Sequence, residues 1–409
     1  MNQRTLYKTI EKIASRDYDS DDKLISAVLD EIIDHERINI IGGRVWKLQP
    51  EKKQYVLIHQ VGEIEKLKRS FALRLDSYVT FNAVARKRTI LAEETNRTLR
   101  KIGIRQYSAT GVGSKIKVGR RKFYEYIMAF NVPTVHSNLV YTLNIISQVV
   151  SARIEKRRQE QESRELMTEL DKARQLQRHI LPEHRQVFGP YEIYGVSVPE
   201  KIVGGDFFNY LPFPQDDRQL GVVIGDAASK GISAAIQALF VSGALMMSVE
   251  YETKITTMMR RINDIVHRIF PGDRFLTMFY CELFIGLRGL SLFSNAGHSS
   301  PIFYSAKTGE FRLLEVTGPI IGLLPDQRYA VGTVNFSRGD LLLLYTDGVT
   351  EANNGSAEFG EERLMKTLKR VVKKSPKEIT LEILQEVQSF SAQGRYHDDK
   401  TLVVIKRTR

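Results

Sequence analysis

Apolar residues recur every three or four positions near the start of the chain, and alternate with polar ones soon after. The helical spacing over residues 22–34 predicts an amphipathic helix. Its apolar positions are Leu24, Ile25, Val28, Leu29, Ile32 and Ile33. The runs INIIGGRVWKL and KQYVLIHQV flank the polar turn QPEK and predict two strands, and FYEYIMAFNVP predicts another. Residues 1–150 are therefore predicted to form a mixed α/β domain.

The segment SATGVGSK, residues 108–115, contains the glycines of a phosphate-binding loop. Ser114 separates Gly113 from Lys115, so the order G-x-x-x-x-G-K-[ST] is not met. We interpret the segment as an ordinary loop. The basic residues from Lys115 to Lys122 either bind an anion or lie on a solvated hairpin, and the hairpin is the favoured interpretation.

A highly charged helical pattern runs over residues 138–181 and ends at Pro182. Its apolar seam has heptad spacing with Gln177 as a polar gap, while the upstream half of the seam is polar. The apolar seam positions are Leu166, Leu170, Ala173 and Ile180. We predict a helical coiled-coil linker over residues 151–181 that pairs with its copy in a homodimer. The alternative is a single solvated helix lying on one domain.

Short β-rich runs follow Pro182, interrupted by two long helical stretches at about 231–269 and 361–393. Eight or more strands with few helices indicate a sheet sandwich flanked by helices. The predicted fold class is therefore α+β, with a separate domain over residues 182–409.

Composition excludes few classes of protein. Lys and Arg outnumber Asp and Glu by 60 to 48, a net charge of +12. The charge is spread along the chain without interleaved aromatic residues, so a solvated surface is favoured over nucleic-acid binding. The single cysteine, Cys281, is predicted to be a core residue and fits a reducing cytoplasm. The N-terminus lacks a signal-peptide pattern, and no run of 18 apolar residues predicts a membrane span.

Acidic residues occupy the edges of four predicted core strands. They are Asp206 in GGDFFNY, Asp226 in VVIGDAASKG, Asp347 in LLLLYTDGVTEA, and Asp398 with Asp399 in YHDDKTLVVI. A single aspartate after a strand is usually a turn or cap residue. Four such positions that converge would repel one another unless protonated or bound to a cation. Oxygen ligands without a Cys or His cluster favour Mg²⁺ or Mn²⁺.

These motifs occur in a recognisable order together with SNAGHSSP. The order resembles the SpoIIE-type branch of metal-dependent (PPM-class) serine/threonine protein phosphatases, over residues 173–407. A diguanylate cyclase would need an acid where GGDFFNY has Phe207, so the cyclase interpretation is rejected. The element order of residues 1–150 resembles a GAF sensor domain, which either binds a small molecule or is a purely structural, dimerising domain. The whole arrangement resembles bacterial regulators of sigma-factor partner switching.

The resemblance implies an αββα sandwich that holds two Mn²⁺ or Mg²⁺ ions. By motif match Asp226 bridges the ions and the carbonyl of Ala227 is a second ligand. Asp347 and Asp398 match the acids that hold one ion. Asp206 matches the acid near the other ion or its water shell. These four aspartates are the predicted catalytic residues.

Asp399 is a further candidate metal ligand, since it replaces or assists Asp398. A metal-activated water would attack phosphorus in line, without a phosphoenzyme. His397 is the better candidate general acid, and His298 is favoured as a structural residue. Lys230 either contacts phosphate or is solvated.

The family commonly has GDVSGKG where this chain has GDAASKG. The departure removes no acid, so we expect an active enzyme. The expected substrate is a phosphorylated STAS-type anti-sigma antagonist, with a small-molecule or protein signal at the GAF-like domain. The alternative is a weakly active or inactive scaffold that binds a partner.

Overall fold

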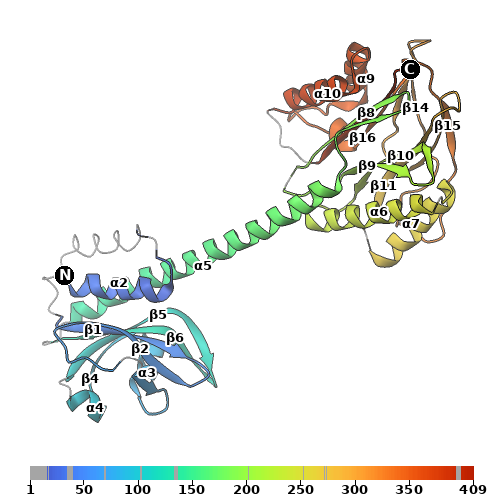
Figure 1. Cartoon of the computed structure of the whole chain (residues 1–409). Helices are drawn as coiled ribbons and strands as arrows, with labels where there is room; N and C mark the ends of the chain where they lie inside the picture. Colours follow the sequence, from blue (N-terminus) through green and yellow to red (C-terminus); the bar gives the residue numbers. More distant parts are fainter. Residues whose placement is uncertain are drawn as a thin grey trace. The chain divides into compact units, whose positions relative to one another are not determined.

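The computed structural model describes residues 16, 18–34, 40–68, 71–101, 104–132, 137–200, 202–251, 253–270, 272, 274–392 and 398–409. The chain divides into two compact units, residues 1–166 and 167–409 (Figure 1). The division falls inside α5 (Ser137–Ile180), the helix predicted over residues 138–181. The finer boundaries at residues 150 and 181 stay predictions.

The N-terminal unit is one antiparallel sheet with helices on both faces (Figure 1). The strand order is β3-β2-β1-β6-β5-β4. Helix α2 and the first part of α5 bury apolar side chains against one face, and α3 and α4 cover the other. The assignment to the GAF family stays a prediction. The elements are α2 (Asp21–Ile33), β1 (Gly42–Gln49), β2 (Gln54–Gly62), β3 (Ala72–Arg74), α3 (Thr80–Lys87), β4 (Thr89–Glu93), α4 (Arg97–Lys101), β5 (Gln106–Val118) and β6 (Arg121–Asn131).

The interpretation of residues 108–115 as a loop is wrong, because they lie inside β5 and pair with β6. Gly111 is required by packing, since a Cβ there would lie 2.1 Å from the Tyr124 ring. Gly113 has a φ of +81° beside a register shift in the ladder. The glycines therefore accommodate an aromatic ring and a bulge. The basic residues from Lys115 to Lys122 lie on the β5–β6 hairpin, as favoured.

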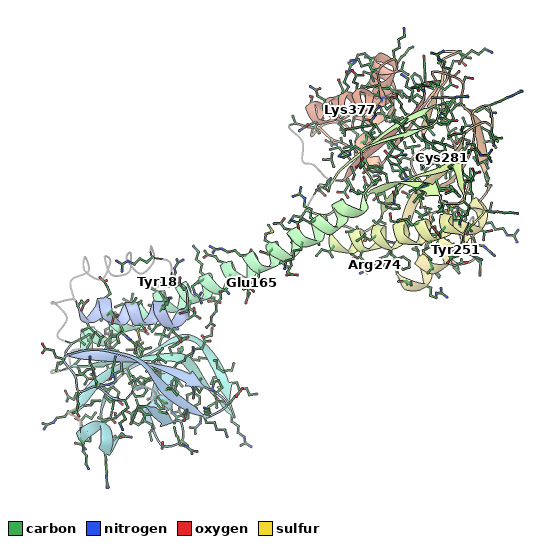
Figure 2. All side chains as sticks on the ribbon, viewed as in Figure 1. Tyr18, Glu165, Tyr251, Arg274, Cys281 and Lys377 are labelled. Carbon is green, nitrogen blue, oxygen red and sulfur yellow. The ribbon has the colours of Figure 1, made fainter. Side chains whose placement is uncertain are left out.

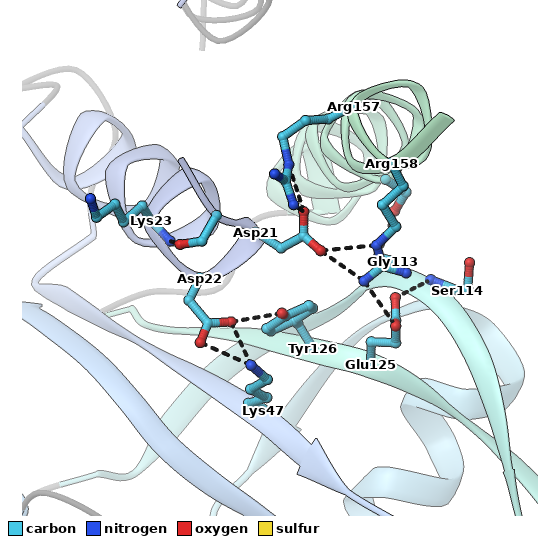
Figure 3. Close-up of polar contacts among 12 residues, drawn as sticks. Asp21, Asp22, Lys23, Lys47, Gly113, Ser114, Glu125, Tyr126, Arg157 and Arg158 are labelled. Carbon is cyan, nitrogen blue, oxygen red and sulfur yellow. Dashed lines mark hydrogen bonds and ion pairs between the residues drawn. The ribbon is translucent and has the colours of Figure 1, made fainter. Parts of the chain in front are cut away.

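A polar network joins α2, α5 and the sheet of the N-terminal unit (Figure 3). Asp21 accepts hydrogen bonds from Arg157 Nε at 2.9 Å and from Arg158 Nη2 at 2.8 Å. Arg158 also donates to Glu125 on β6 at 3.0 Å. Asp22 accepts from the Tyr126 hydroxyl at 2.7 Å. Each arginine donates from Nε and Nη2 to one oxygen of Asp21, and these charge-assisted hydrogen bonds hold the start of α2 against α5.

The C-terminal unit consists of two stacked sheets with helices on both outer faces (Figure 1). The strand orders are β15-β12-β11-β10-β9 and β14-β13-β16-β17-β8-β7. Between the sheets lies an apolar core that includes Phe208, Val222, Phe279, Leu342 and Val403. Helices α6 and α7 cover the first sheet, and α9 and α10 cover the second. This is the αββα sandwich that the resemblance implied.

The strands of this unit follow the β-rich runs of the sequence. They are β7 (Arg185–Phe188), β8 (Tyr191–Val198), β9 (Phe207–Phe213), β10 (Asp216–Ala227), β11 (Leu276–Phe284), β12 (Leu290–Ala296), β13 (Ile302–Tyr304), β14 (Phe311–Leu313), β15 (Gly332–Asn335), β16 (Leu341–Tyr345) and β17 (Lys400–Arg407). The helices are α6 (Ile232–Glu250), α7 (Ile255–Ile269), α8 (Asp347–Thr350), α9 (Gly360–Val371) and α10 (Pro376–Phe390). Each of the two long helical stretches is thus divided into two helices.

Helix α6 is the one helix within the described residues that is long and apolar enough to cross a membrane. Its buried face, which includes Ala234, Ala238, Val241 and Leu245, belongs to the core beneath the first sheet. Such a face is typical of a core helix in a packed domain. The expected absence of a membrane span stays a prediction.

Cys281 lies in β11 within the C-terminal unit (Figure 2). Its side chain is fully buried, and burial raises the pKa of the thiol. A buried thiol of raised pKa is unreactive, so the expected core role is confirmed.

Candidate metal centre

Two neighbouring strands bring the first pair of acids together. Asp206 directly precedes β9, and Asp226 is next to the last residue of β10. The strands are antiparallel, with Phe207 opposite Gly225. The start of β9 therefore lies beside the end of β10, and both aspartates lie at one edge of the first sheet.

The second sheet places the other acids in the same way. Asp347 begins α8 directly after β16, and Asp398 and Asp399 precede β17. Strands β16 and β17 are antiparallel, with Tyr345 opposite Leu402. The pairing again joins the end of one strand to the start of its neighbour. All the predicted site acids therefore lie at strand ends of the sandwich.

A cleft of about 210 Å³ opens where these edges meet. Its lining residues are Asp226, Ala227, Ala228, Ser229, Lys230, Phe275, Thr277, Asp347 and Asp398. Asp206 lies behind the cleft and is only 3% exposed. The structure therefore brings Asp226, Asp347 and Asp398 onto one surface, with Asp206 beneath it.

The acids raise one another's pKa values. Burial, followed by the charges of Asp347, Asp398 and Asp399, raises the pKa of Asp226 to about 8. Burial and the charge of Asp226 hold the pKa of Asp206 well above its usual range. Burial and the charge of Asp398 raise the pKa of Asp347. A bound cation favours the ionised carboxylates and offsets this mutual repulsion.

Asp398 and Asp399 have different surroundings. Asp399 is buried, and its Oδ1 and Oδ2 accept hydrogen bonds from the Glu200 amide at 2.7 Å and the Gly205 amide at 2.6 Å. Asp398 lines the cleft, and its Oδ2 lies 3.1 Å from Lys230 Nζ. Asp399 therefore holds the backbone that leads to Asp206, whereas Asp398 presents a carboxylate to the cleft.

The donor set suits a hard divalent cation. It consists of carboxylate oxygens from two sheet edges and the carbonyl of Ala227, and the described residues that line the cleft include no cysteine or histidine. Within the described residues, no group of three or more His, Cys, Asp or Glu side chains lies close enough together to hold a metal ion in this arrangement. Like-charged carboxylates are expected to stay apart until a cation screens them. The residues present thus fit Mg²⁺ or Mn²⁺ by chemistry and placement.

Comparison with known proteins assigns the family. Residues 216–408 match the family model described as Stage II sporulation protein E (SpoIIE). The C-terminal unit is a SpoIIE-family domain. Its phosphatase class, predicted from the motifs, is confirmed. The matched residues begin after Asp206, so the family model does not cover that position.

Two curated relatives extend the SpoIIE match. The chain is 26% identical to phosphoserine phosphatase RsbU of Bacillus subtilis over 246 residues, which are 59% of this chain and 71% of RsbU. It is 31% identical to protein IcfG of Synechocystis over 269 residues, which are 58% of this chain and 41% of IcfG. The chain thus spans less than half of IcfG.

A solved structure supports the fold. The SiaA PP2C domain of Pseudomonas aeruginosa matches with a TM-score of 0.52 and 18% identity, covering 60% of this chain and 98% of that domain. This likeness agrees with the two-sheet, four-layer arrangement of the SpoIIE-family domain.

Sequence reasoning missed the residues that position Asp206. The Thr346 hydroxyl donates to Asp206 Oδ2 at 2.7 Å, and the Thr401 amide donates to Thr346 Oγ1 at 3.0 Å. Thr346 directly precedes Asp347 in the motif YTDG, and that adjacency was the available signal. Glu200 was also missed, because it contributes its backbone amide, which no motif records.

The loop after Asp226 carries the departure from the SpoIIE pattern. Its Ala228 amide donates to the Phe275 carbonyl at 3.0 Å, as the ladder of β10 and β11 requires. Gly231 has a φ of +71°, a conformation that favours glycine. Ser229 occupies the usual glycine position, and its hydroxyl oxygen is buried without a partner among the described residues. The departure leaves Asp226 in place at the end of β10.

The structure describes one of the two candidate histidines, His298. His298 is 3% exposed, and its Nδ1 lies 2.9 Å from the Thr277 hydroxyl. Burial lowers the pKa of His298 to about 4, so the ring is neutral at physiological pH. The structural role that was favoured for His298 stays a prediction. His397 lies outside the described residues.

Proposed function

We propose that this protein is a Mn²⁺- or Mg²⁺-dependent phosphatase acting on phosphoserine or phosphothreonine. The observation that carries the proposal is the convergence of Asp226, Asp347 and Asp398 on one cleft of a SpoIIE-family domain. The relative RsbU, a phosphoserine phosphatase by name, supports the choice of substrate class.

In this proposal Asp206, Asp226, Asp347, Asp398 and the Ala227 carbonyl would hold two ions, and Asp226 would be the ligand that both ions share. Two such ions supply hydroxide near neutral pH and neutralise the phosphate oxygens. Asp399 is a positioning residue and the least suited ligand, because backbone amides occupy its oxygens.

Lys230 belongs to the substrate side of the cleft. Burial favours its neutral amine, yet the hydrogen bond with Asp398 raises the pKa of Lys230. The ammonium therefore stays charged at neutral pH, and we assign it a contact with the phosphate of the substrate.

The first test is hydrolysis of p-nitrophenyl phosphate and of a phosphoserine peptide, with Mn²⁺, with Mg²⁺ and with a chelator. Native protein is expected to turn over only with metal, and Asp347→Asn is expected to lose that turnover. Asp217→Asn is the matched control, because Asp217 is an exposed acid at the opposite end of β10. Metal-independent turnover, or full activity of Asp347→Asn, would contradict the proposal.

The proposed substrate is a phosphorylated STAS-type anti-sigma antagonist in cytoplasmic partner-switching signalling. The kinship with RsbU supports this finer assignment. Intact-mass measurement is expected to show metal-dependent loss of one phosphate from such a protein. Retention of that phosphate by a preparation that hydrolyses the peptide would exclude this substrate and leave the activity intact.

The N-terminal unit is proposed to regulate the site through α5. Leu181, directly after this helix, packs against the core that also contains Ala227 and Ala234. A displacement at Leu181 thus has a packed route to the metal-binding loop. Deletion of residues 1–150 is expected to change the phosphatase rate, and an unchanged rate and metal dependence would contradict regulation by this route.

The proposed dimer uses the seam of α5, where Leu166 is 60% exposed. An exposed leucine at a heptad position favours pairing with a second copy. Light scattering is expected to give twice the chain mass for native protein and a lower mass for Leu166→Lys. A monomeric native protein would contradict this dimer.

A further inference from the structure

The motif SNAGH, residues 294–298, ends β12 and forms the turn after it. Asn295 closes this turn, because its Nδ2 donates to the His298 carbonyl at 3.1 Å and its Oδ1 accepts from the His298 amide at 2.8 Å. Gly297, between them, has a φ of +66°, a conformation that favours glycine. The motif therefore fixes the backbone that carries the His298 ring.

The His298 ring lies beside Thr277 on β11. Its Nδ1 is 2.9 Å from the Thr277 hydroxyl, and Thr277 is the one side chain within the described residues to which the ring is hydrogen-bonded. Burial lowers the pKa of His298, and a smaller effect of the Tyr345 backbone opposes it. Burial of a polar ring costs free energy unless the ring is hydrogen-bonded. An apolar side chain could fill this space at lower cost, so packing alone does not account for a histidine here.

Thr277 lines the metal cleft next to Asp226. In the antiparallel ladder of β10 and β11, Thr277 lies directly opposite Asp226. Side chains at opposite positions point to the same face of a sheet, with their Cβ atoms roughly 4.5–5.5 Å apart. A hydroxyl can donate and accept at the same time, and among the described residues the Thr277 hydroxyl is hydrogen-bonded to His298 alone. It therefore has a further hydrogen bond to offer at the cleft.

We propose that Thr277 is a catalytic residue whose hydroxyl holds the water that attacks phosphorus, and that His298 positions this hydroxyl. The inference rests on the proposed phosphatase function. The oxygen of the water forms the new bond to phosphorus, the bond to the serine or threonine oxygen of the substrate breaks, and one proton of the water passes to that leaving oxygen. Thr277 keeps its own proton and restricts the rotation of the water, so that a lone pair faces phosphorus.

His298 has a separate task in this arrangement. Without its contact, the Thr277 hydroxyl would be free to donate to the Asp226 carboxylate opposite it. The ring takes up one side of the hydroxyl and leaves the other side for the water. Thr277 adds this contact without adding charge to a cleft that already holds several carboxylates, so it does not increase their mutual repulsion.

The first test separates turnover from binding. In the full chain with Mn²⁺, Thr277→Val is expected to lower kcat for p-nitrophenyl phosphate about 10–100-fold. KM is expected to stay unchanged, because the hydroxyl acts on the water and not on the substrate. The Mn²⁺ affinity, measured from the rise in melting temperature with metal, is expected to stay at the native value. Full kcat of Thr277→Val, or a loss that follows weaker Mn²⁺ binding, would overturn the proposal.

Other threonine variants are the controls. Thr277→Ser keeps the hydroxyl and is expected to retain most of kcat, and a serine variant as slow as Thr277→Val would overturn the proposal. Thr333→Val, at an exposed threonine on β15 of the same sheet, is expected to match native protein. If Thr277→Val does not fold, Thr277→Ala lets solvent reach His298 Nδ1, and the same loss of kcat is expected. Native protein without metal-dependent turnover would contradict the proposed function, and this inference with it.

A double variant tests the link between the two residues. His298→Leu alone is expected to lower kcat, because the Thr277 hydroxyl is then free to rotate. The double variant of Thr277→Val with His298→Leu is expected to be no slower than Thr277→Val, since His298 acts through a hydroxyl that is already absent. Losses that multiply in the double variant, or full kcat of His298→Leu, would overturn the positioning role of His298.

Discussion

Replacing Asp226 with asparagine is expected to abolish metal-dependent hydrolysis and to make the metal-free protein more resistant to heat. Asp226 lies between the acids of both sheets, so its loss removes a shared ligand. A loss of about 4 kcal/mol of transition-state stabilisation corresponds to roughly a 10³-fold lower rate. The metal-free gain arises because asparagine is uncharged, while the native carboxyl is buried beside Asp347 and Asp398.

The sign of this gain depends on pH. Because the folded-state pKa of Asp226 is raised to about 8, its ionisation destabilises the folded state as pH rises above the unfolded value near ~3.9. The advantage of Asp226→Asn without metal is therefore expected to grow from pH 5 to pH 8, by roughly 2–6 °C in melting temperature.

A crossing of melting temperatures would test this account. Saturating Mn²⁺ at about 100 times its dissociation constant stabilises native protein by about 2.7 kcal/mol, and Asp226→Asn should gain less. The variant is then the more stable protein in chelator and the less stable one in metal. Asp217→Asn should follow native protein in both. Equal metal stabilisation of Asp226→Asn and native protein would show that Asp226 holds no ion.

The adjacent acids Asp398 and Asp399 are expected to fail in different ways. Asp399→Ala removes the acceptor of two backbone hydrogen bonds, from Glu200 and Gly205. Each such bond to a charged group contributes about 1.5 kcal/mol or more, so the metal-free melting temperature should fall by roughly 6–12 °C. Activity is lost with it, because the backbone before Asp206 is no longer held.

Asp398→Ala is the matched comparison. It removes a partly exposed ion pair with Lys230, worth at most about 1 kcal/mol, and it relieves repulsion at the cleft. Its metal-free melting temperature should stay near the native value while metal-dependent turnover is lost. Thermal melts in chelator and turnover in Mn²⁺ decide the question. Equal melting temperatures of the two variants would show that Asp399 does not position the loop.

The sequence predicted the strand-end acids because each follows or precedes a strongly apolar run. LLLLYTDG and VVIGDAASKG mark a buried strand and its exposed end within a few residues. The sandwich followed from the number and length of such runs. The sequence does not show which residues far apart in the chain contact one another. Nothing near Asp399 in sequence indicates that its partners are the amides of Glu200 and Gly205, almost two hundred positions earlier.

Some local sequence patterns were misinterpreted because tertiary packing overrides them. The glycines of SATGVGSK were interpreted as a loop. Gly111 instead lies in a strand, where the absence of a side chain leaves room for the Tyr124 ring. The boundary between α9 and α10 could have been predicted from the sequence, but the sequence analysis did not predict it. Ser375 caps α10 through a reciprocal contact with Glu378, directly before Pro376, and a capping residue followed by proline is a helix start.

The place of β17 in the second sheet has a consequence for synthesis on the ribosome. This strand lies between β16 and β8 and pairs with both, and its leading residues complete the acid cluster. The predicted site acids, from Asp206 to Asp398, are therefore separated by almost two hundred residues of nascent chain. When residue 350 has been synthesised, β17 is still missing. The other strands of the second sheet then form two separate groups. A partial chain that ends before residue 398 lacks the proposed ligand Asp398, so the proposed activity would be acquired in one late step.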